Sequence, residues 1–452
     1  MCRGRTAMEP VLDLAGIGFG PSNLALAIAV EEHGRPVRAR FFERQARFGW
    51  HRGMLLEDAT MQVSFLKDLV TLRNPTSGFS FLCYLKERGR LVDFVNHKNL
   101  FPLRKEFHDY FEWAAERVRH HVEYGSEVTS VRASDEGFEI TTSPTGHTGQ
   151  TSHTSPTGQK SQTNETNQAN QTRIKSRNLV LATGLQANLP EGIETGDRIW
   201  HNKDLLHNVG KLKDPRHVVV VGAGQSAAEA VAFFHDRFPE AEVHGVFARY
   251  GYSPADDSSF ANRIFDPAAV DDFYRAPEAV KKRLMGYHAN TNYGVVDQDL
   301  IEELYRRVYR EKVLDKQRLL LHNTSRLTDV NANGKCVIES LADGSQLPVD
   351  ADVIVYATGY RPADPATLLG ELADSCERDD LGRLKVTRDY RVVTDKSIKG
   401  GIYLQGGTEH THGITSSLLS NTAVRVGEIL ESILRRPQAV QESVSKVAAH
   451  VS

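Results

Sequence analysis

The stretch "DLAGIGFGPSNLALAIAV", residues 13–30, places a glycine turn between an expected strand and an expected helix. The apolar run before the turn is typical of a buried parallel strand, and the helical spacing after it predicts a helix that ends at Gly34. We expect Gly16 to allow the tight turn and Gly18 to allow the close approach of a pyrophosphate. About 25 residues past Gly18, Glu43 ends the next expected strand, where an acidic side chain accepts ribose hydroxyls. The pattern predicts a dinucleotide-binding unit.

A second stretch, "VVVVGAGQSAAEAV" at residues 218–231, has the same organisation. Gly222, Gly224 and Ala227 occupy the three fingerprint positions. The acidic residue is missing, and Arg249 ends the following expected strand instead. A cation at this position suits the 2'-phosphate of NADPH better than the free ribose of NADH. The alternative is that Arg249 is a solvated surface residue.

Two similar strands that close on Thr-Gly, at residues 178–184 and 352–360, are expected to lie at the hinge between a nucleotide domain and its neighbour. The pattern predicts an α/β fold with two Rossmann-like dinucleotide-binding domains, for FAD and NADPH, and a small substrate-binding region. The expected divisions are a first FAD-binding part at 9–190, an NADPH-binding domain at 191–330 with substrate-binding segments at about 255–310, and a second FAD-binding part at 331–452. Residues 142–172 hold no aliphatic side chain larger than alanine, so we expect a disordered insertion there.

Composition limits the partners and the compartment. With 40% hydrophobic residues in 452 and a net charge of -3, the chain can bury a large core and has no basic field for nucleic acid or an anionic membrane. Its four cysteines are widely spaced, which argues against a disulfide framework and against a flavin disulfide reductase. No apolar run approaches the roughly 20 residues of a membrane span, so we expect a cytoplasmic protein. The histidines are scattered, and no metal site is expected.

Four longer motifs narrow the chemistry, at residues 50–113, 254–267, 290–297 and 410–420. They closely resemble the microbial N-hydroxylating monooxygenases, which use FAD and NADPH to hydroxylate the side-chain amine of ornithine or lysine for siderophore hydroxamates. The resemblance covers the whole chain except 142–172, and "TLRNPTSGFSFLCYL" is more similar to the ornithine branch than to the lysine branch. The Phe-x-Gly-x3-His motif of broader flavin monooxygenases is absent, which favours amine hydroxylation over Baeyer–Villiger chemistry.

The resemblance implies a reaction. NADPH would reduce FAD, O2 would give a C4a-hydroperoxyflavin, and its distal oxygen would pass to the terminal amine of L-ornithine, giving N5-hydroxyornithine. No side-chain nucleophile or metal is needed, and the family's common homotetramer is the expected assembly. L-lysine or a diamine such as putrescine remains an alternative substrate. A non-catalytic flavoprotein that acts through a partner is a further alternative.

The resemblance also assigns residues, with Asn292 and Lys67 as the catalytic pair. The residues expected at FAD are Gly16, Gly18, Pro21, Ser22, Glu43, Phe48, Trp50, His51, Gln62, Val128, Ser417, Leu418 and Leu419. Those expected at NADPH are Lys203, Gly224, Gln225, Ser226, Ala227, Arg249, Asn292, Tyr293 and Gly294. Those expected around the amino acid are Lys67, Asn262, Arg263, Ile264, Phe265, Asn292 and Ser420.

Two of these assignments have structural alternatives. An ammonium in the apolar "VSFLKDL" needs an anionic partner, which a substrate carboxylate would provide, but Lys67 could instead pair with Asp68 or reach the surface. Asn262 follows an Asp-Asp-Ser turn, where asparagine commonly stabilises the turn itself.

Overall fold

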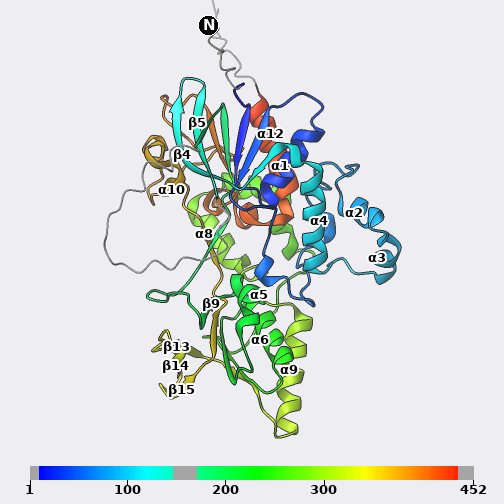
Figure 1. Ribbon diagram of the computed structural model, residues 1–452, viewed down its shortest axis with the longest axis vertical. Coiled ribbons are helices and arrows are strands. Elements are labelled where there is room, and N and C mark those ends of the chain that lie inside the picture. Colours follow the sequence, from blue (N-terminus) through cyan, green and yellow to red (C-terminus); the bar gives the residue numbers. More distant parts are fainter. Residues whose placement is uncertain (1–9, 146–170, 436–452) are drawn as a thin grey trace, which may run out of the picture.

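The computed structural model describes residues 10–145 and 171–435. The expected α/β class is confirmed: two parallel five-stranded sheets lie one above the other along the long axis (Figure 1). Of the segment 142–172 that was expected to be disordered, residues 146–170 lie outside the described residues, whereas residues 142–144 and Thr172 belong to strands, so the expected bounds are wrong. No helix in the two described ranges is both long and apolar enough to cross a membrane.

The first sheet has the strand order β18-β7-β1-β2-β3, and all of its pairs are parallel. Its strands are β1 (Leu14–Ile17), β2 (Ala39–Glu43), β3 (Val122–Tyr124), β7 (Asn178–Leu181) and β18 (Gly401–Leu404). Helices α1 (Pro21–Glu32), α4 (Arg104–Arg117) and α12 (Thr422–Leu434) bury their apolar sides on one face. An antiparallel sheet of β4 (Ser126–Ser134), β5 (Gly137–Pro144) and β6 (Thr172–Ser176) covers the other face.

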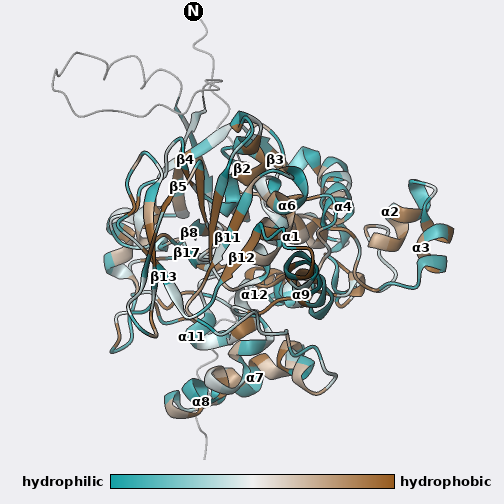
Figure 2. Cartoon of the chain, turned by 90° about the horizontal axis from the view of Figure 1, so that it is seen from below, coloured by the Kyte–Doolittle hydropathy of each residue, from teal (hydrophilic) through white to brown (hydrophobic). Residues whose placement is uncertain are grey.

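The second sheet repeats this plan with the order β12-β11-β10-β16-β9. Its strands are β9 (Ile199–His201), β10 (His217–Val221), β11 (Glu242–Val246), β12 (Leu319–His322) and β16 (Val353–Tyr356). Helices α6 (Gln225–Arg237) and α9 (Gln298–Val313) cover one face, and β13 (Ser325–Thr328), β14 (Lys335–Ser340) and β15 (Gln346–Asp350) cover the other. In both units apolar strands are enclosed between more polar outer layers (Figure 2).

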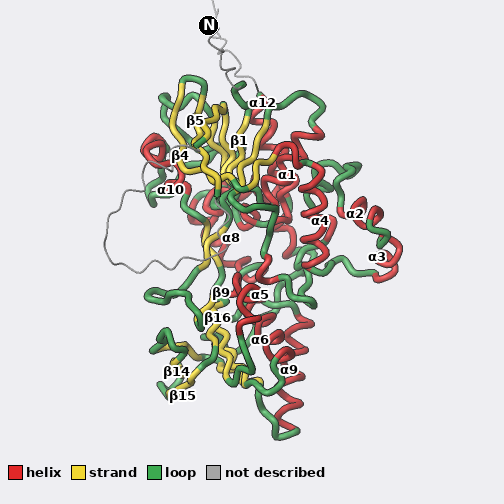
Figure 3. Tube along the Cα trace, viewed as in Figure 1, coloured by secondary structure: helices red, strands yellow, loops and turns green. Residues whose placement is uncertain are grey.

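The boundary expected at 330/331 is wrong. β16 pairs in parallel with β10 and β9, and β13–β15 packs on the same sheet, so the second unit continues to Tyr356. A short antiparallel pair, β8 (Leu185–Ala187) with β17 (Tyr360–Pro362), labelled in Figure 2, then connects the two units. Figure 3 shows β1 in the upper unit and β16 in the lower one. The two Thr-Gly strands, β7 and β16, therefore belong to different sheets, although both lead into this connection.

Shorter helices lie around the two sheets. They are α2 (Phe81–Glu87), α3 (Leu91–His97), α5 (Leu205–Asn208), α7 (Pro267–Arg275), α8 (Glu278–His288), α10 (Pro365–Leu369) and α11 (Glu409–His412).

Candidate functional site: two nucleotide turns and the space between them

The first glycine turn depends on two glycines for different reasons. Gly18 has φ +82°, and a Cβ there would lie 2.5 Å from the carbonyl oxygen of Ala182, so only glycine fits. Gly16 has no such conformation. Its missing side chain instead admits the ring of Phe41, which would lie 2.1 Å from a Cβ. Gly16 is needed because β2 packs closely against β1 at this position. The expectation that Gly16 permits the tight turn is therefore wrong.

The N-terminus of α1 is open to a ligand. The helix begins at Pro21 with Gly20 as its N-cap, no side chain caps it, and a Cβ at Gly20 would meet nothing within 4 Å. The uncapped first turn, with the positive end of the helix dipole, suits a phosphate. At the strand end nearby, the buried carboxylate of Glu43 accepts hydrogen bonds from the backbone N–H of Phe19 (2.6 Å) and of Gln45 (2.9 Å). Glu43 thus also fixes the loop that carries the turn.

A buried arginine that the sequence did not indicate joins this turn to the C-terminal segment. Arg425 is fully buried, and its Nη1 donates to the carbonyl oxygens of Thr415 (3.1 Å) and Ser416 (2.7 Å). Its Nη2 lies 3.4 Å from the Oγ of Ser22, at the start of α1. The only available signal was an arginine on the apolar face of an amphipathic helix.

Several buried polar atoms beside this turn have no protein partner among the described residues. They are Gln405 Oε1, Thr408 Oγ1, Ser416 Oγ, Ser420 Oγ and Asn421 Oδ1. Buried polar atoms are normally hydrogen-bonded, so such a group indicates a polar ligand between the C-terminal segment and the first sheet. The residues present therefore fit a dinucleotide such as FAD.

The aromatic segment expected at FAD divides into core and surface residues. Phe48 is only 4% exposed and packs against Phe19 and Phe111, so it supports the loop from inside the core and does not line a cavity. Trp50 packs edge-on to Phe111. His51 has a left-handed backbone (φ +49°), which is uncommon for a residue with a side chain and marks a constrained position.

Gln62 and Val128, two further residues expected at FAD, lie on different sides. The Nε2 of Gln62 donates to Asp297 Oδ2 (3.1 Å), and the same oxygen accepts from Gln225 Nε2 (3.0 Å). Gln62 therefore connects the first unit to the second fingerprint helix, α6. Val128 lies at a bulge in β4 and is half-buried against the core of the covering sheet.

A second unpredicted contact holds the two units together. Arg104, at the start of α4, makes a two-pronged ion pair with Glu229 of α6, at 2.7 and 2.9 Å. The side chains are 11% and 4% exposed. Because this pair is buried and bidentate, it fixes the orientation of α4 relative to α6 far better than a surface pair would.

The second glycine turn has the same local geometry as the first. Gly222 has φ +141°, and a Cβ there would lie 2.4 Å from the carbonyl oxygen of Ala357. Gly224 is the N-cap of α6, again without a side-chain cap. The N–H of Ala227 donates to the carbonyl oxygen of Gly224 (3.0 Å), so the N–H groups of Gln225 and Ser226 remain for phosphate oxygens. Gly294 also lies next to this turn, because a Cβ at Gly224 would be 3.5 Å from the Cα of Gly294.

Arg249 and a cavity lie next to this turn. Arg249 is exposed, and its Nη1 donates to the carbonyl oxygen of Gly294 (2.6 Å). A cavity of about 470 Å³ opens at the carboxyl ends of β10 and β11, lined by Gly222, Arg249, Ile193, Leu327 and others. This is the edge at which open α/β sheets bind nucleotides.

Lys203 does not share this place. It follows β9, whereas Arg249 follows β11, and β10 and β16 lie between those strands. At about 4.8 Å per strand the two strand ends are roughly 14 Å apart, so the two cations start from well-separated places on the sheet edge. Lys203 instead packs its backbone against Gly53 and lies 3.9 Å from Asp204.

Lys67 has the environment expected of an anion-binding residue. It ends the short helix η2 (Phe65–Lys67), is half-buried, and its Nζ lies 5.4 Å from the centroid of the Phe265 ring. Burial lowers the pKa of Lys67, and the more distant Asp266 partly opposes that effect. The Asp68 carboxylate does not compensate the charge, because it accepts the backbone N–H groups of residues 70, 71 and 81. The alternative of a Lys67–Asp68 pair is therefore wrong.

The segment η7 (Ala261–Phe265) gives a mixed result. It contacts η10 (Ile414–Ser417), so Phe265 and Ile264 lie near the C-terminal segment. Arg263 instead faces solvent and pairs with Asp266, so its expected place beside the amino acid is wrong. The Nδ2 of Asn262 donates to the carbonyl oxygens of residues 257 and 258, which is the turn role given as its alternative.

The segment after η8 (Ala289–Thr291) closes the site from the other side. Asn292 is half-buried, and the neighbouring Tyr293 donates its hydroxyl to Glu409 of α11. Ser420, in η11 (Leu419–Asn421), is buried, and η11 contacts η2. Lys67, Phe265, Asn292 and Ser420 thus come from four separate segments that surround the junction of the two units.

Comparisons with known proteins agree with this arrangement. The ornithine N-hydroxylase of Kutzneria sp. 744, solved with reduced FAD, NADP+ and L-ornithine, is 45% identical with a TM-score of 0.87, covering 94% of this chain and 100% of its own. The L-ornithine N(5)-monooxygenase of Burkholderia cepacia is 37% identical over 425 residues, 90% of each chain. The cadaverine monooxygenase of Erwinia amylovora, solved with FAD, is 27% identical with a TM-score of 0.80, covering 98% and 100%.

A family model described as L-lysine 6-monooxygenase/L-ornithine 5-monooxygenase matches residues 10–362. This match spans both glycine turns and three of the four segments around the junction. The chain belongs to the L-lysine 6-monooxygenase/L-ornithine 5-monooxygenase family.

Proposed function

We propose that the protein hydroxylates the terminal amine of L-ornithine, using FAD at the first glycine turn and NADPH at the second. The observation that carries the choice of substrate is Lys67, a half-buried ammonium above Phe265 whose neighbouring carboxylate is engaged elsewhere. An α-amino acid supplies the carboxylate that Lys67 lacks, and a charge-assisted bond of this kind is among the stronger ones in proteins. The 45% identical Kutzneria enzyme, which was solved with L-ornithine, supports the same choice.

Once bound, the reduced flavin supplies the activated oxygen, so the chain has to hold the amine and exclude water. Lys67 fixes the carboxylate end of the substrate. Asn292 orients the amine end in this proposal, which its position between the second glycine turn and α11 supports. The pKa of Tyr293 is raised by burial and by Glu409, so its hydroxyl stays protonated and holds the 292–294 segment against α11.

Water exclusion depends on the C-terminal segment. Ser416 and Ser420 are buried, and Arg425 ties the carbonyl groups of the segment to α12. The flavin end of the site is thereby covered by chain that is far from the fingerprint in sequence. A covered site protects an oxygen-activating cofactor from unproductive loss of its oxygen as hydrogen peroxide.

Substrate length tests the proposal. Hydroxylamine formation and NADPH oxidation are measured in parallel with L-ornithine, L-lysine and putrescine on the FAD-loaded enzyme. We expect coupled product from ornithine and mainly uncoupled oxidation with lysine, because a misplacement of about 1 Å can reduce the rate roughly 100-fold. Equal coupled yields from lysine and ornithine would contradict the ornithine assignment while leaving the N-hydroxylation chemistry intact.

A diamine is the second candidate substrate, because the cadaverine monooxygenase of Erwinia amylovora has a similar fold. A diamine has no carboxylate, so it would leave Lys67 without its partner. Coupled turnover of putrescine at the ornithine rate would favour this candidate.

We also propose that the protein is a homo-oligomer. Helix α3 extends away from the body in both views and exposes Val92 (70%) and Val95 (61%) (Figures 1 and 2). Paired exposed apolar residues on a projecting helix favour contact with a second copy. Light scattering on the double variant Val92→Asp/Val95→Asp should show a smaller particle. The matched change Leu381→Asp, at a residue equally exposed elsewhere, should leave the assembly unchanged.

A further inference from the structure

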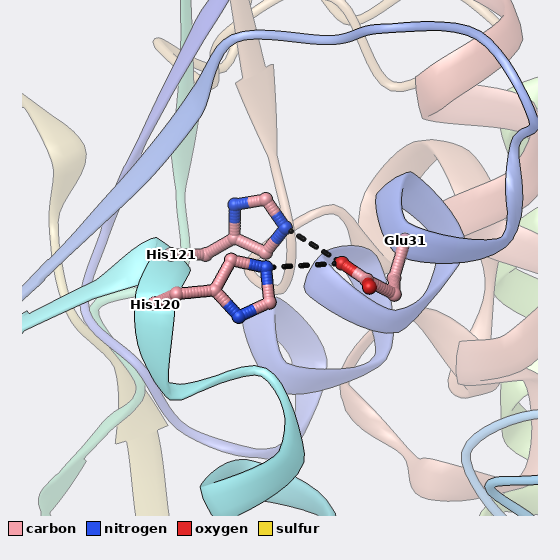
Figure 4. Close-up of side chains that lie close together, drawn as sticks. All are labelled: Glu31, His120 and His121. Carbon is pink, nitrogen blue, oxygen red and sulfur yellow. Dashed lines mark hydrogen bonds and ion pairs between the residues drawn. The ribbon is translucent and has the colours of Figure 1, made fainter.

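Three groups of metal-ligating side chains occur among the described residues, all outside the site described above. One is formed by Glu31, His120 and His121, where both imidazole Nε2 atoms already bond to the same Glu31 oxygen, at 3.1 and 3.2 Å (Figure 4). A second lies along α4, where the carboxylate of Glu112 is shared with Arg52. In both groups, ordinary hydrogen bonds or ion pairs account for the contacts.

His108 of the second group also has one nitrogen, Nε2, that is unpartnered among the described residues, but the third group is different because it has unpartnered nitrogens on two histidines that lie near the same carboxylate oxygen. His217, Glu242 and His244 lie on one face of the second sheet: β10 pairs His217 opposite Glu242, and His244 is two residues further along β11. His244 is 3% exposed. The Nδ1 of His217 and the Nε2 of His244 are buried and have no hydrogen-bond partner in the described chain.

Both orphan nitrogens converge on one carboxylate oxygen. Oε2 of Glu242 lies 3.4 Å from His217 Nδ1 and 3.6 Å from His244 Nε2, and the three ligand atoms lie within 4.8 Å of one another. Zinc bonds of about 2.0–2.1 Å place the ligands of a tetrahedral site about 3.3–3.4 Å apart. Two of the three separations are therefore close to those of a shared metal ion, and the two imidazole nitrogens lie within 4.8 Å of each other.

The far nitrogen of the His244 ring also has a partner. The Nδ1 of His244 lies 3.0 Å from Nε2 of His322 on β12, and the two rings are stacked at 14°. A hydrogen bond at the far nitrogen fixes the tautomer that leaves Nε2 free for a metal.

We propose that His217, Glu242 and His244 form a binding site for one divalent transition-metal ion of the zinc type, with His322 hydrogen-bonded to the far nitrogen of His244. His217 and Glu242 are half-exposed, which leaves a coordination position open to water. Both are the first residues of their strands, at the edge of the sheet opposite the glycine turn. The ion would therefore join β10 to β11 at the edge of the sheet away from the nucleotide.

Equilibrium dialysis of the full-length, FAD-loaded protein without a polyhistidine tag, against buffered Zn²⁺ and followed by metal analysis, tests the site. We expect one zinc per chain. His322→Ala removes the hydrogen-bond partner of a ligand, and such a loss weakens metal binding roughly 10- to 100-fold. His217→Ala and Glu242→Gln each remove a ligand, so each should weaken zinc binding by at least that much. These variants avoid replacing the fully buried His244, and FAD content and circular dichroism verify that they fold.

His120→Ala is the matched control, because it removes a ligand from the group of Figure 4 and leaves this one intact. Zinc should also raise the thermal unfolding midpoint of the parent protein but not that of Glu242→Gln, since a ligand of the folded state stabilises it. The proposal is overturned if no zinc is retained, if His217→Ala and Glu242→Gln bind zinc as the parent does, or if His120→Ala is the variant that loses it.

Discussion

The two glycine turns are alike in local structure and different in what covers them. In each, one glycine has a positive φ and lies against the carbonyl of a neighbouring strand's end, and the following helix has a glycine N-cap without a side-chain cap. The first turn is covered by the C-terminal segment and the buried Arg425. The second opens into a cavity of about 470 Å³ beside the exposed Arg249. The glycine fingerprint therefore sets where a dinucleotide binds, whereas segments far away in the sequence determine how firmly it is held.

This contrast suits the two cofactors. A flavin has to remain through every turnover, whereas NADPH has to enter and NADP+ has to leave. A site closed by buried hydrogen bonds opens only at a cost in free energy, and an open cleft exchanges its ligand freely. Four experiments test the likeness and the contrast.

The largest effect is expected where the turns are alike. Gly18→Ala and Gly222→Ala should each lower the free energy of unfolding by about 3–5 kcal/mol, combining a left-handed backbone with a Cβ placed 2.5 or 2.4 Å from a carbonyl oxygen. Chemical denaturation of the FAD-free protein measures this. Gly20→Ala is the control, because its Cβ meets nothing within 4 Å and its φ is -83°. Similar losses for Gly18→Ala and Gly20→Ala would contradict the explanation.

The next effect tests the covering of the first turn. Arg425→Met should keep the buried volume but leave the carbonyls of Thr415 and Ser416 without a donor, at about 1–3 kcal/mol each. We expect FAD to dissociate at least 10-fold more readily, measured by FAD retained after dialysis, while NADPH affinity changes little. Arg263→Met is the matched control, since that arginine is exposed and pairs only with Asp266. Equal loss of both nucleotides would mean that Arg425 supports the whole fold.

The third effect concerns the space between the turns. Lys67→Ala should raise the ornithine KM roughly 10- to 150-fold, the equivalent of a charge-assisted bond of about 1.5–3 kcal/mol. Anaerobic reduction of the flavin by NADPH should remain nearly intact, because Lys67 contacts neither glycine turn. Stopped-flow absorbance separates the two steps. If reduction slows as much as hydroxylation, Lys67 belongs to a nucleotide site instead.

The smallest effect tests the open turn. Arg249→Ala should reduce the preference for NADPH over NADH about 10-fold, near the lower end for one charge-assisted contact, because the side chain is exposed to solvent. Rates of flavin reduction with both nucleotides give the ratio. Lys203→Ala is the comparison variant, because Lys203 follows β9 and Arg249 follows β11: we expect a smaller change in the ratio than for Arg249→Ala. If the ratio changes in Lys203→Ala but not in Arg249→Ala, Lys203 binds the 2'-phosphate and Arg249 is a solvated surface residue.

Local pattern in the sequence determined the two strand–turn–helix units, the second glycine turn, Gly18 of the first turn and the class of fold, whereas the role of Gly20 as the N-cap of α1 was not predicted. These features depend on contacts within about 30 residues, so a single stretch of chain carries the whole signal. The motifs around Lys67, Asn292 and Ser420 also identified the family, because each is long enough to be specific. The acidic residue at the end of β2 could also be predicted from the sequence, and Glu43 does end that strand.

Tertiary structure decided what pairs and packs over long distances. The apolar run of β16 could join either sheet, and only its pairing with β10 moved the domain boundary. The separation of Lys203 from Arg249 follows from strand order, and the solvent-facing Arg263 from its ion pair with Asp266. Arg425 closes the first turn only because α12 packs on α1. The physical reason is common to all: a residue's type fixes which bonds it can make, but the fold selects the partner.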